Sequence, residues 1–200
     1  ISALKWGRPD AKKTFAWGSR MKWRQFIATL FILSAGLANA SPNCMVIGDS
    51  IAVGVSAMLA KDKDLHCETI AKVGRPTSEV LSKAPIIIEA RNVVISTGSN
   101  DHQGRPYQFA TLRRRIVGNV TWILPAKQHE AREVISRIAV EHGDRVIDLA
   151  KIPLGDGIHP TPNGYLTVAR TVRDDMKRQV ATTNALLLVR YTLSNVGMYR

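Results

Sequence analysis

Between residues 44 and 180, short apolar runs alternate with segments in which apolar residues recur every three or four positions. Short runs rich in Val and Ile, bounded by turn residues, are typical of buried strands. They lie at 44–48, 65–74, 92–98, 119–125 and 144–149. The segments between them have helical spacing, which predicts helices at 51–61, 77–90, 106–118, 126–143 and 161–180, with Pro85 interrupting or ending the first part of the second helix.

This alternation predicts the fold class. Strands that alternate with helices along a chain form a parallel sheet that helices cover on both faces. We therefore expect a three-layer α/β/α domain around a five-stranded parallel sheet. In such a sheet the site lies beyond the carboxyl ends of the strands, so the residues after each strand are the first candidates for chemistry.

Polar and glycine residues follow four of the five predicted strands. Ser50 follows the first strand, Gly74 the second and Asn100 the third, while Asp156 and His159 follow the fifth through a loop. Each of them has an ordinary alternative as a helix cap, a turn or a loop residue. Gathered at one edge of a sheet, they supply the nucleophile, base, orienting carboxylate and oxyanion donors that acyl transfer from an ester requires.

In this hypothesis Ser50 is the nucleophile, His159 is the general base, and Asp156 fixes the tautomer of the histidine. The backbone N–H groups of Ser50 and Gly74 and the side-chain amide of Asn100 would stabilise the oxyanion. Because the base must be neutral to accept the serine proton, activity should fall at acid pH. No G-x-S-x-G motif is present, so the nucleophile elbow of the α/β-hydrolases does not apply.

Four segments resemble the conserved blocks of the SGNH hydrolases, also called the GDSL esterase/lipase family. They are "VIGDSIAVG", "KVGRPTS", "STGSND" and "DGIHP", in that order across about residues 44–180. The resemblance implies a flavodoxin-like domain, esterase activity, the site residues named above, and no metal or organic cofactor. The sequence departs from the family at Ile51, where Leu is common, and at Arg75-Pro76, which are bulky beside an oxyanion donor.

The resemblance also bears on the substrate, since the family acts on lipid esters, thioesters and acetyl groups of glycans. Short loops and few aromatic residues near the motifs predict an open, shallow site that suits small acyl groups. Those aromatics are Tyr107, Phe109, Trp122 and Tyr165. Acetyl esters of envelope or extracellular glycans fit such a site. Two alternatives stay open: a non-catalytic carbohydrate-binding or scaffold module, and a basic protein that binds surfaces or nucleic acid.

Residues 21–40 have the layout of a secretory signal peptide: a basic start, an apolar run at 26–37, and small residues up to Ala40. The apolar run is shorter than the roughly 20 residues of a spanning helix. We therefore predict a secreted or periplasmic protein with no stable membrane span after cleavage; an uncleaved anchor is the alternative. Residues 1–20 form an upstream extension without a recognisable pattern, 41–181 the hydrolase domain, and 182–200 a tail whose structure the pattern leaves open.

The net charge of +12 is concentrated outside the predicted domain. Residues 1–40 hold seven Lys and Arg and one acidic residue, which is half of the charge. The remaining basic residues are spread along the chain except for the run at 113–115, and such a short run usually forms a solvated helix face. We therefore expect a small-molecule or glycan ester as partner and no nucleic acid; the sequence says nothing about the oligomeric state.

The two cysteines, Cys44 and Cys67, lie on the first two predicted strands. An oxidising compartment permits a disulfide between them, with two buried thiols as the alternative. The five histidines are scattered and no cysteine pair has ligand spacing, so no metal site is predicted.

Overall fold

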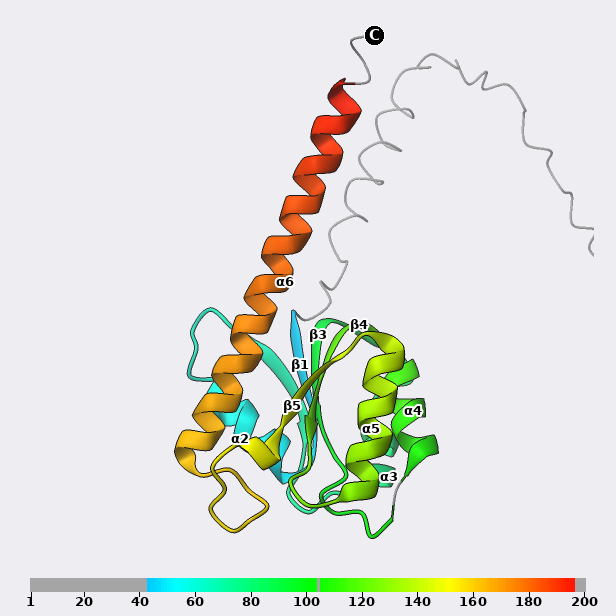
Figure 1. Ribbon diagram of the computed structural model, residues 1–200, viewed down its shortest axis with the longest axis vertical. Coiled ribbons are helices and arrows are strands. Elements are labelled where there is room, and N and C mark those ends of the chain that lie inside the picture. Colours follow the sequence, from blue (N-terminus) through cyan, green and yellow to red (C-terminus); the bar gives the residue numbers. More distant parts are fainter. Residues whose placement is uncertain (1–42, 104, 197–200) are drawn as a thin grey trace, which may run out of the picture. The chain divides into compact units, whose positions relative to one another are not determined.

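The computed structural model describes residues 43–103 and 105–196. The chain divides into two compact units, and all of the described residues belong to the second, Ser41–Arg200. Five parallel strands form one sheet in the order β2-β1-β3-β4-β5 (Figure 1). The strands are β1 (Cys44–Gly48), β2 (Cys67–Ala71), β3 (Ile88–Ser96), β4 (Ile116–Leu124) and β5 (Arg145–Asp148). The predicted signal peptide and upstream extension lie outside the described residues.

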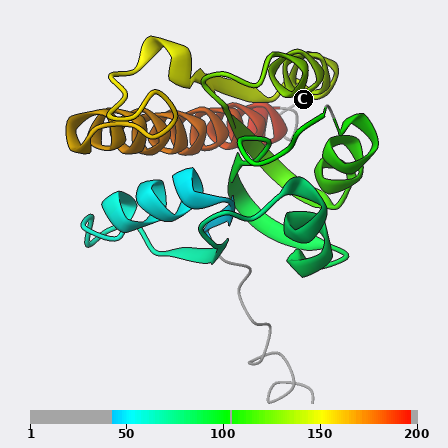
Figure 2. The same ribbon diagram turned by 90° about the horizontal axis from the view of Figure 1, so that it is seen from below.

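Helices cover both faces of this sheet, which confirms the predicted three-layer α/β/α fold. They are α2 (Ser50–Leu59), α3 (Thr77–Lys83), α4 (Pro106–Arg114), α5 (His129–His142) and α6 (Pro162–Val196), with a short 3-10 turn η1 (Leu149–Lys151). Helices α2 and α6 pack on one face, and α3, α4 and α5 pack on the other (Figure 2).

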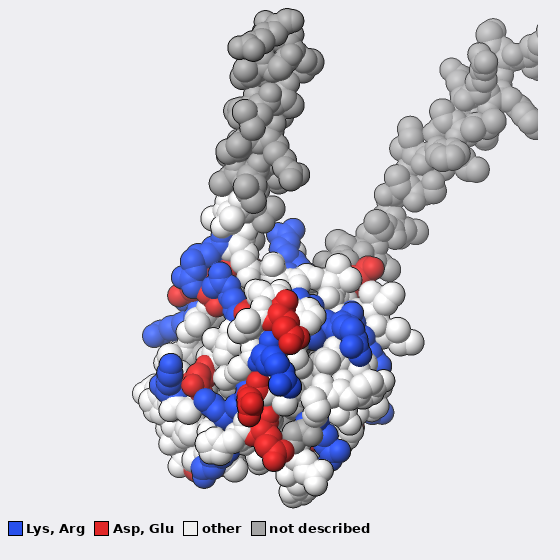
Figure 3. Space-filling view, turned by 45° about the vertical axis from the view of Figure 1, so that its right-hand side comes forward, with Lys and Arg blue, Asp and Glu red and all other residues white. Residues whose placement is uncertain are grey.

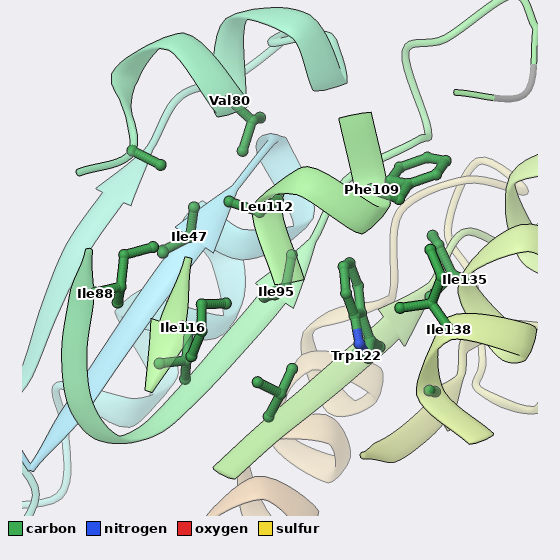
Figure 4. Close-up of a cluster of buried hydrophobic side chains, with 14 of the residues drawn as sticks. Ile47, Val80, Ile88, Ile95, Phe109, Leu112, Ile116, Trp122, Ile135 and Ile138 are labelled. Carbon is green, nitrogen blue, oxygen red and sulfur yellow. The ribbon is translucent and has the colours of Figure 1, made fainter. Parts of the chain in front are cut away.

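Each face of the sheet has its own hydrophobic core. Successive side chains of a strand point to opposite faces, so Ile47 of β1 enters the core under α3, α4 and α5, while Val46 enters the core under α2 and α6. In the first core Phe109 and Trp122 meet edge to face, with ring centroids 6.5 Å apart (Figure 4). Both rings are fully buried, so neither lines the edge of the sheet where the site was predicted.

Two predicted helices are too long, because β3 and β4 begin earlier than expected. Helix α3 ends at Lys83, and Ala84 is already extended, since the residue before a proline avoids helical geometry. The next residues begin β3 at Ile88, and β4 likewise begins at Ile116. Near these starts Gly118 has φ +133°, and a Cβ there would lie 2.1 Å from the carbonyl oxygen of Ala90. Only glycine permits this close approach of the two strands.

The last helix is longer than predicted. The apolar spacing indicated an end near residue 180, but α6 continues to Val196. No glycine or proline occurs between residues 165 and 196, so no helix-breaking residue interrupts it. Of the helices that the structure describes, none is long and apolar enough to cross a membrane.

A disulfide joins Cys44 and Cys67. The two residues are opposite each other at the amino ends of β1 and β2, with Cα atoms 4.4 Å apart. The bridge therefore links the strand that leads to Ser50 with the strand that leads to Gly74.

Candidate active site

Ser50 is the first residue of α2, directly beyond the carboxyl end of β1. The chain turns sharply here at Gly48, where a Cβ would lie 1.7 Å from the carbonyl oxygen of Ser96, so only glycine fits. Asp49 caps the helix by accepting a hydrogen bond of 3.0 Å from the N–H of Ile51. Ser50 is thus held at the sheet edge, with its backbone N–H at the positive end of a helix.

Three side chains form a continuous hydrogen-bonded chain at this edge. The Oγ of Ser50 lies 2.8 Å from Nε2 of His159, and Nδ1 of His159 lies 2.7 Å from Oδ2 of Asp156. An ionised carboxylate only accepts hydrogen bonds, so Nδ1 carries the proton and Nε2 is left to accept from the serine. This is the geometry of a Ser-His-Asp triad, assembled from residues 109 positions apart.

Asp156 is held in its ionised form by the loop that carries it. Its Oδ1 accepts hydrogen bonds from the N–H groups of His159, at 2.7 Å, and Ile158, at 2.9 Å. These hydrogen bonds keep the pKa of Asp156 well below its ordinary range, although the carboxylate is exposed. The backbone N–H of His159 has the largest effect, followed by its imidazole and then by the N–H of Ile158. The orienting group therefore stays charged across the range in which a histidine titrates.

The same loop also begins α6. Its two sides are joined by the bridge between Leu154 and Pro160 and by a hydrogen bond of 2.8 Å from the N–H of Gly155 to the carbonyl of His159. Thr161 then caps the helix through its Oγ1, which accepts from the N–H of Gly164 at 3.1 Å. The position of His159 is thus fixed from both ends.

The candidate oxyanion donors lie beyond the strands on either side of β1. Gly74 follows β2, and Asn100 follows β3. The amide of Asn100 donates one hydrogen bond of 3.3 Å to the carbonyl of Arg75, which leaves its second N–H for a ligand. Within the described part of the chain, neither Ser50 nor Gly74 donates its backbone N–H to a protein acceptor. All three predicted donors are therefore available.

The bulky Arg75 does not obstruct this side of the site. Its side chain is buried and turned away, with Nη1 3.5 Å from the carbonyl of Ile70 and Nε 3.3 Å from the carboxylate of Glu79. Gly74 has φ +72°, and apart from its own chain neighbours no residue has an atom within 4 Å of the position that a Cβ would take. The space on the side where a Cβ of Gly74 would lie is therefore open.

Solved structures share this architecture. An aryl esterase from M. smegmatis is 14% identical over 68% of this chain and 99% of its own, with a TM-score of 0.55. A GDSL-like lipase from Bacteroides thetaiotaomicron is 16% identical over 78% and 97% of the two chains, with a TM-score of 0.53. A carbohydrate acetylesterase from Sinorhizobium meliloti is 13% identical over 69% and 99%, with a TM-score of 0.51. The chain has the SGNH hydrolase fold. No family model and no curated protein matches the sequence.

Within this SGNH hydrolase fold, a buried network connects two of the loops that carry candidate site residues. The carboxylate of Asp101 accepts hydrogen bonds from the N–H of Thr77, at 3.1 Å, and from its hydroxyl, which also lies 2.8 Å from the hydroxyl of Thr97. Thr77 starts α3, three residues after Gly74, and Asp101 follows Asn100. The network therefore sets the position of one candidate oxyanion donor relative to the other. The sequence alone assigns Asp101 no separate role, because nothing in the spacing points to a partner 24 positions away.

Asp49 is the second group that sequence reasoning missed. It is 0% exposed, and its Oδ1 also accepts from the hydroxyl of Ser96 at 3.2 Å, while no partner in the described chain bonds its Oδ2. Burial raises the pKa of this carboxyl to about 6, against opposing hydrogen bonds of which that from Ile51 is the strongest. The ring of Tyr165 packs over Gly54 on the same helix, and its pKa is raised by burial and then by Asp49 and Asp156.

Replacing Asp49 by Asn is expected to change how stability depends on pH. Below pH 3.8 the carboxyl holds its proton in both the folded and the unfolded chain. As pH rises from 3.8 to about 6, the unfolded chain releases this proton before the folded chain does. The free energy of unfolding of wild type therefore falls by about 3 kcal/mol and stays lower at higher pH. Asn keeps the cap and cannot ionise, so urea unfolding at pH 4 and pH 8 should show most of that loss in wild type and not in Asp49→Asn. The exposed Asp64→Asn is the control; an equal loss in Asp49→Asn would contradict the assignment.

Among the described residues, no group of three or more His, Cys, Asp or Glu side chains is placed to hold a metal ion. A cavity of about 270 Å³ lies at the opposite, amino-terminal edge of the sheet, where Asn43, Asn92 and Arg173 are among its lining residues. The triad is not part of that cavity and opens directly to solvent, with the side chains of His159 and Asp156 40% and 59% exposed.

Proposed function

We propose that this chain is a serine esterase of the SGNH family that hydrolyses small acyl esters, acetyl esters among them. The observation that supports it most is the hydrogen-bonded chain from Ser50 through His159 to Asp156 at the carboxyl edge of the sheet. The names of the similar structures, an aryl esterase, a GDSL-like lipase and a carbohydrate acetylesterase, agree with ester-bond hydrolysis. The signal-like segment at 21–40 supports action outside the cytoplasm, in the periplasm or the medium.

In this mechanism the Oγ of Ser50 attacks the ester carbonyl carbon while Nε2 of His159 takes its proton. The carbonyl oxygen becomes negative and is stabilised by the N–H groups of Ser50 and Gly74 and the amide of Asn100. The C–O bond to the alcohol then breaks, and the alcohol oxygen receives the proton from His159. Water, deprotonated by His159, releases the acid from the acyl-serine and restores the hydroxyl.

The shape of the site favours small acyl groups. Phe109 and Trp122, two of the aromatics near the motifs, are fully buried in the core, and the region in front of Gly74 is open. A long acyl chain needs a concave apolar lining that buries most of its surface. Two exposed aliphatic residues adjoin candidate site residues along the chain, Val73 before Gly74 and Ile158 before His159.

The proposal is tested by labelling with a fluorophosphonate, which modifies an activated serine. Labelling is expected in wild type, absent in Ser50→Ala, and retained in Ser78→Ala, which changes an exposed serine of α3. On p-nitrophenyl esters of rising chain length, acetate should be turned over faster than octanoate, and acetate release from acetylated polysaccharide should be detectable. Folded protein that neither labels nor hydrolyses would instead indicate a binding module.

Charge distribution gives no support to the nucleic-acid alternative. Figure 3 shows acidic side chains interspersed among the basic ones on the face in view. Several basic residues are paired, including Arg113 with Asp144 and Arg132 with Asp148. Nucleic-acid binding proteins instead present a continuous basic patch or stripe.

A further inference from the structure

The carboxylates at the carboxyl edge of the sheet are all occupied. Asp49 and Asp101 are buried, and Asp148 forms two hydrogen bonds with Arg132, at 2.7 and 3.0 Å. Asp156 is bonded within the triad. Glu130, in the first turn of α5, has a partner as well. Among the described residues, none of these carboxylates forms an ion pair with a lysine, although Arg132 and, to a smaller extent, the charge of Lys151 lower the pKa of Asp148.

Three exposed lysines at the same edge form no ion pair within residues 43–103 and 105–196; we call them the lysine rim, and they are Lys72, Lys127 and Lys151. Lys72 directly follows β2, and its backbone N–H bonds the carbonyl of Gly48, two residues before Ser50. Lys151 ends the turn after β5. The lysine rim therefore places exposed ammonium groups around the candidate site.

Lys127 lies against the catalytic loop itself. Its Nζ lies 2.7 Å and its Cε 3.1 Å from the position that a Cβ on Gly157 would take. Gly157 is the residue after Asp156 and is two positions before His159, so the ammonium group rests on the segment that carries the base. Gly157 has φ +81°, and its lack of a side chain leaves the space that Lys127 occupies.

The chemistry determines which part of an ester would face this charge. The general acid must reach the leaving oxygen, so the alcohol part departs on the His159 side of the carbonyl carbon. The acyl oxygen lies on the other side, toward Gly74 and Asn100. An ammonium group beside the His159 loop is therefore placed to attract an anion on the alcohol part.

On the basis of the proposed function, we propose that the lysine rim selects esters whose alcohol part carries a carboxylate or a phosphate, with Lys127 as the main specificity-determining residue. A neutral acyl group, such as acetyl, on an acidic glycan or a phosphorylated alcohol has this chemistry. The acyl group itself needs no charge, in agreement with the open space before Gly74.

The experiment compares three acetyl esters on the full chain: 4-acetoxybenzoate, 4-acetoxyphenyl phosphate and the neutral 4-acetoxybenzamide. Wild type should prefer an anionic ester in kcat/KM, and Lys127→Met should lower the ratio of anionic to neutral turnover by about three- to fivefold. Lys127→Arg should restore the ratio, and Lys61→Met, which removes an exposed lysine beyond the other end of α2, should leave it as in wild type. The preference should also shrink between about 0.01 M and about 1 M salt, because ions screen exposed charges.

The outcomes separate this inference from the proposed function. If the ratio of kcat/KM to that of the neutral ester is larger for the phosphate ester, the preferred substrate is an ester of a phosphorylated alcohol. If this ratio is larger for the carboxylate ester, the preferred substrate is an ester of an acidic glycan. Turnover of the neutral ester with no anionic preference, or a preference that Lys127→Met leaves unchanged, overturns the inference and keeps the esterase. Absence of turnover on all three esters, together with absence of Ser50 labelling, overturns both.

Discussion

Replacing His159 by Asn should lower kcat for acetyl-ester hydrolysis by about 10³- to 10⁴-fold. The imidazole is the only group joined to the hydroxyl of Ser50, at 2.8 Å, among the described side chains. Asn cannot take the serine proton, so attack and departure of the alcohol both lose their proton-transfer catalyst. The oxyanion donors remain, which is why turnover above the uncatalysed rate should persist. Steady-state kinetics on p-nitrophenyl acetate, with circular dichroism to verify folding, measures the loss.

The control for this variant is His129→Asn, which changes an exposed histidine at the start of α5. It should retain wild-type kcat. The dependence of kcat/KM on pH adds an independent readout: the rate should fall at acid pH, and Asp156 is not the cause, since its pKa lies far below the ordinary range. A His159→Asn protein that keeps more than a tenth of the wild-type rate would exclude His159 as the base.

The positions of the five main site residues follow from the sequence because one topological rule governs them. The carboxyl ends of parallel strands meet at one edge, so residues that directly follow β1, β2 and β3 are brought together whatever lies between them. The rule depends only on where each strand ends. Those ends were predicted to within about three residues, and the starts of β3 and β4 were four and three residues too late. Pro85 and Gly118 account for the early strand starts. Pro85 makes Ala84 extended and so ends α3, and Gly118 allows β4 to approach β3 closely.

The supporting groups of the site could not be predicted in the same way. Asp101 and Thr77 bond across 24 positions because two loops fold over each other, and no periodicity in the sequence records such a contact. The burial of Asp49 depends on Ser96 and on the packing of α2, which are properties of the assembled core. Lys127 is an ordinary surface lysine in the sequence, and only the structure places its ammonium group against Gly157. Side-chain environment, in contrast to strand order, needs the three-dimensional structure.

Removing the disulfide, by Cys44→Ala together with Cys67→Ala, should lower the free energy of unfolding by about 3 kcal/mol. The bridge closes a loop between residues 23 positions apart, and in the chain-entropy model its loss gives the unfolded chain more freedom. A reduction of this size corresponds to a fall of about 10 °C in Tm for a domain of this length. Urea unfolding and thermal scans of the two proteins measure it, and a reducing agent should destabilise wild type while leaving the double variant unchanged.

The same variant separates stability from catalysis. Cys44 and Cys67 lie at the amino ends of β1 and β2, whereas Ser50 and Gly74 lie beyond the carboxyl ends. The pairing of the two strands continues through Ile47 with Ile70 and Gly48 with Ala71, so the site end of this strand pair has its own support. Well below its Tm, the double variant should therefore keep a kcat within about twofold of wild type, because surrounding packing restricts the effect to the unfolding equilibrium. A large fall in kcat in a protein that is still folded would mean instead that the bridge sets the spacing between Ser50 and Gly74 through the length of both strands.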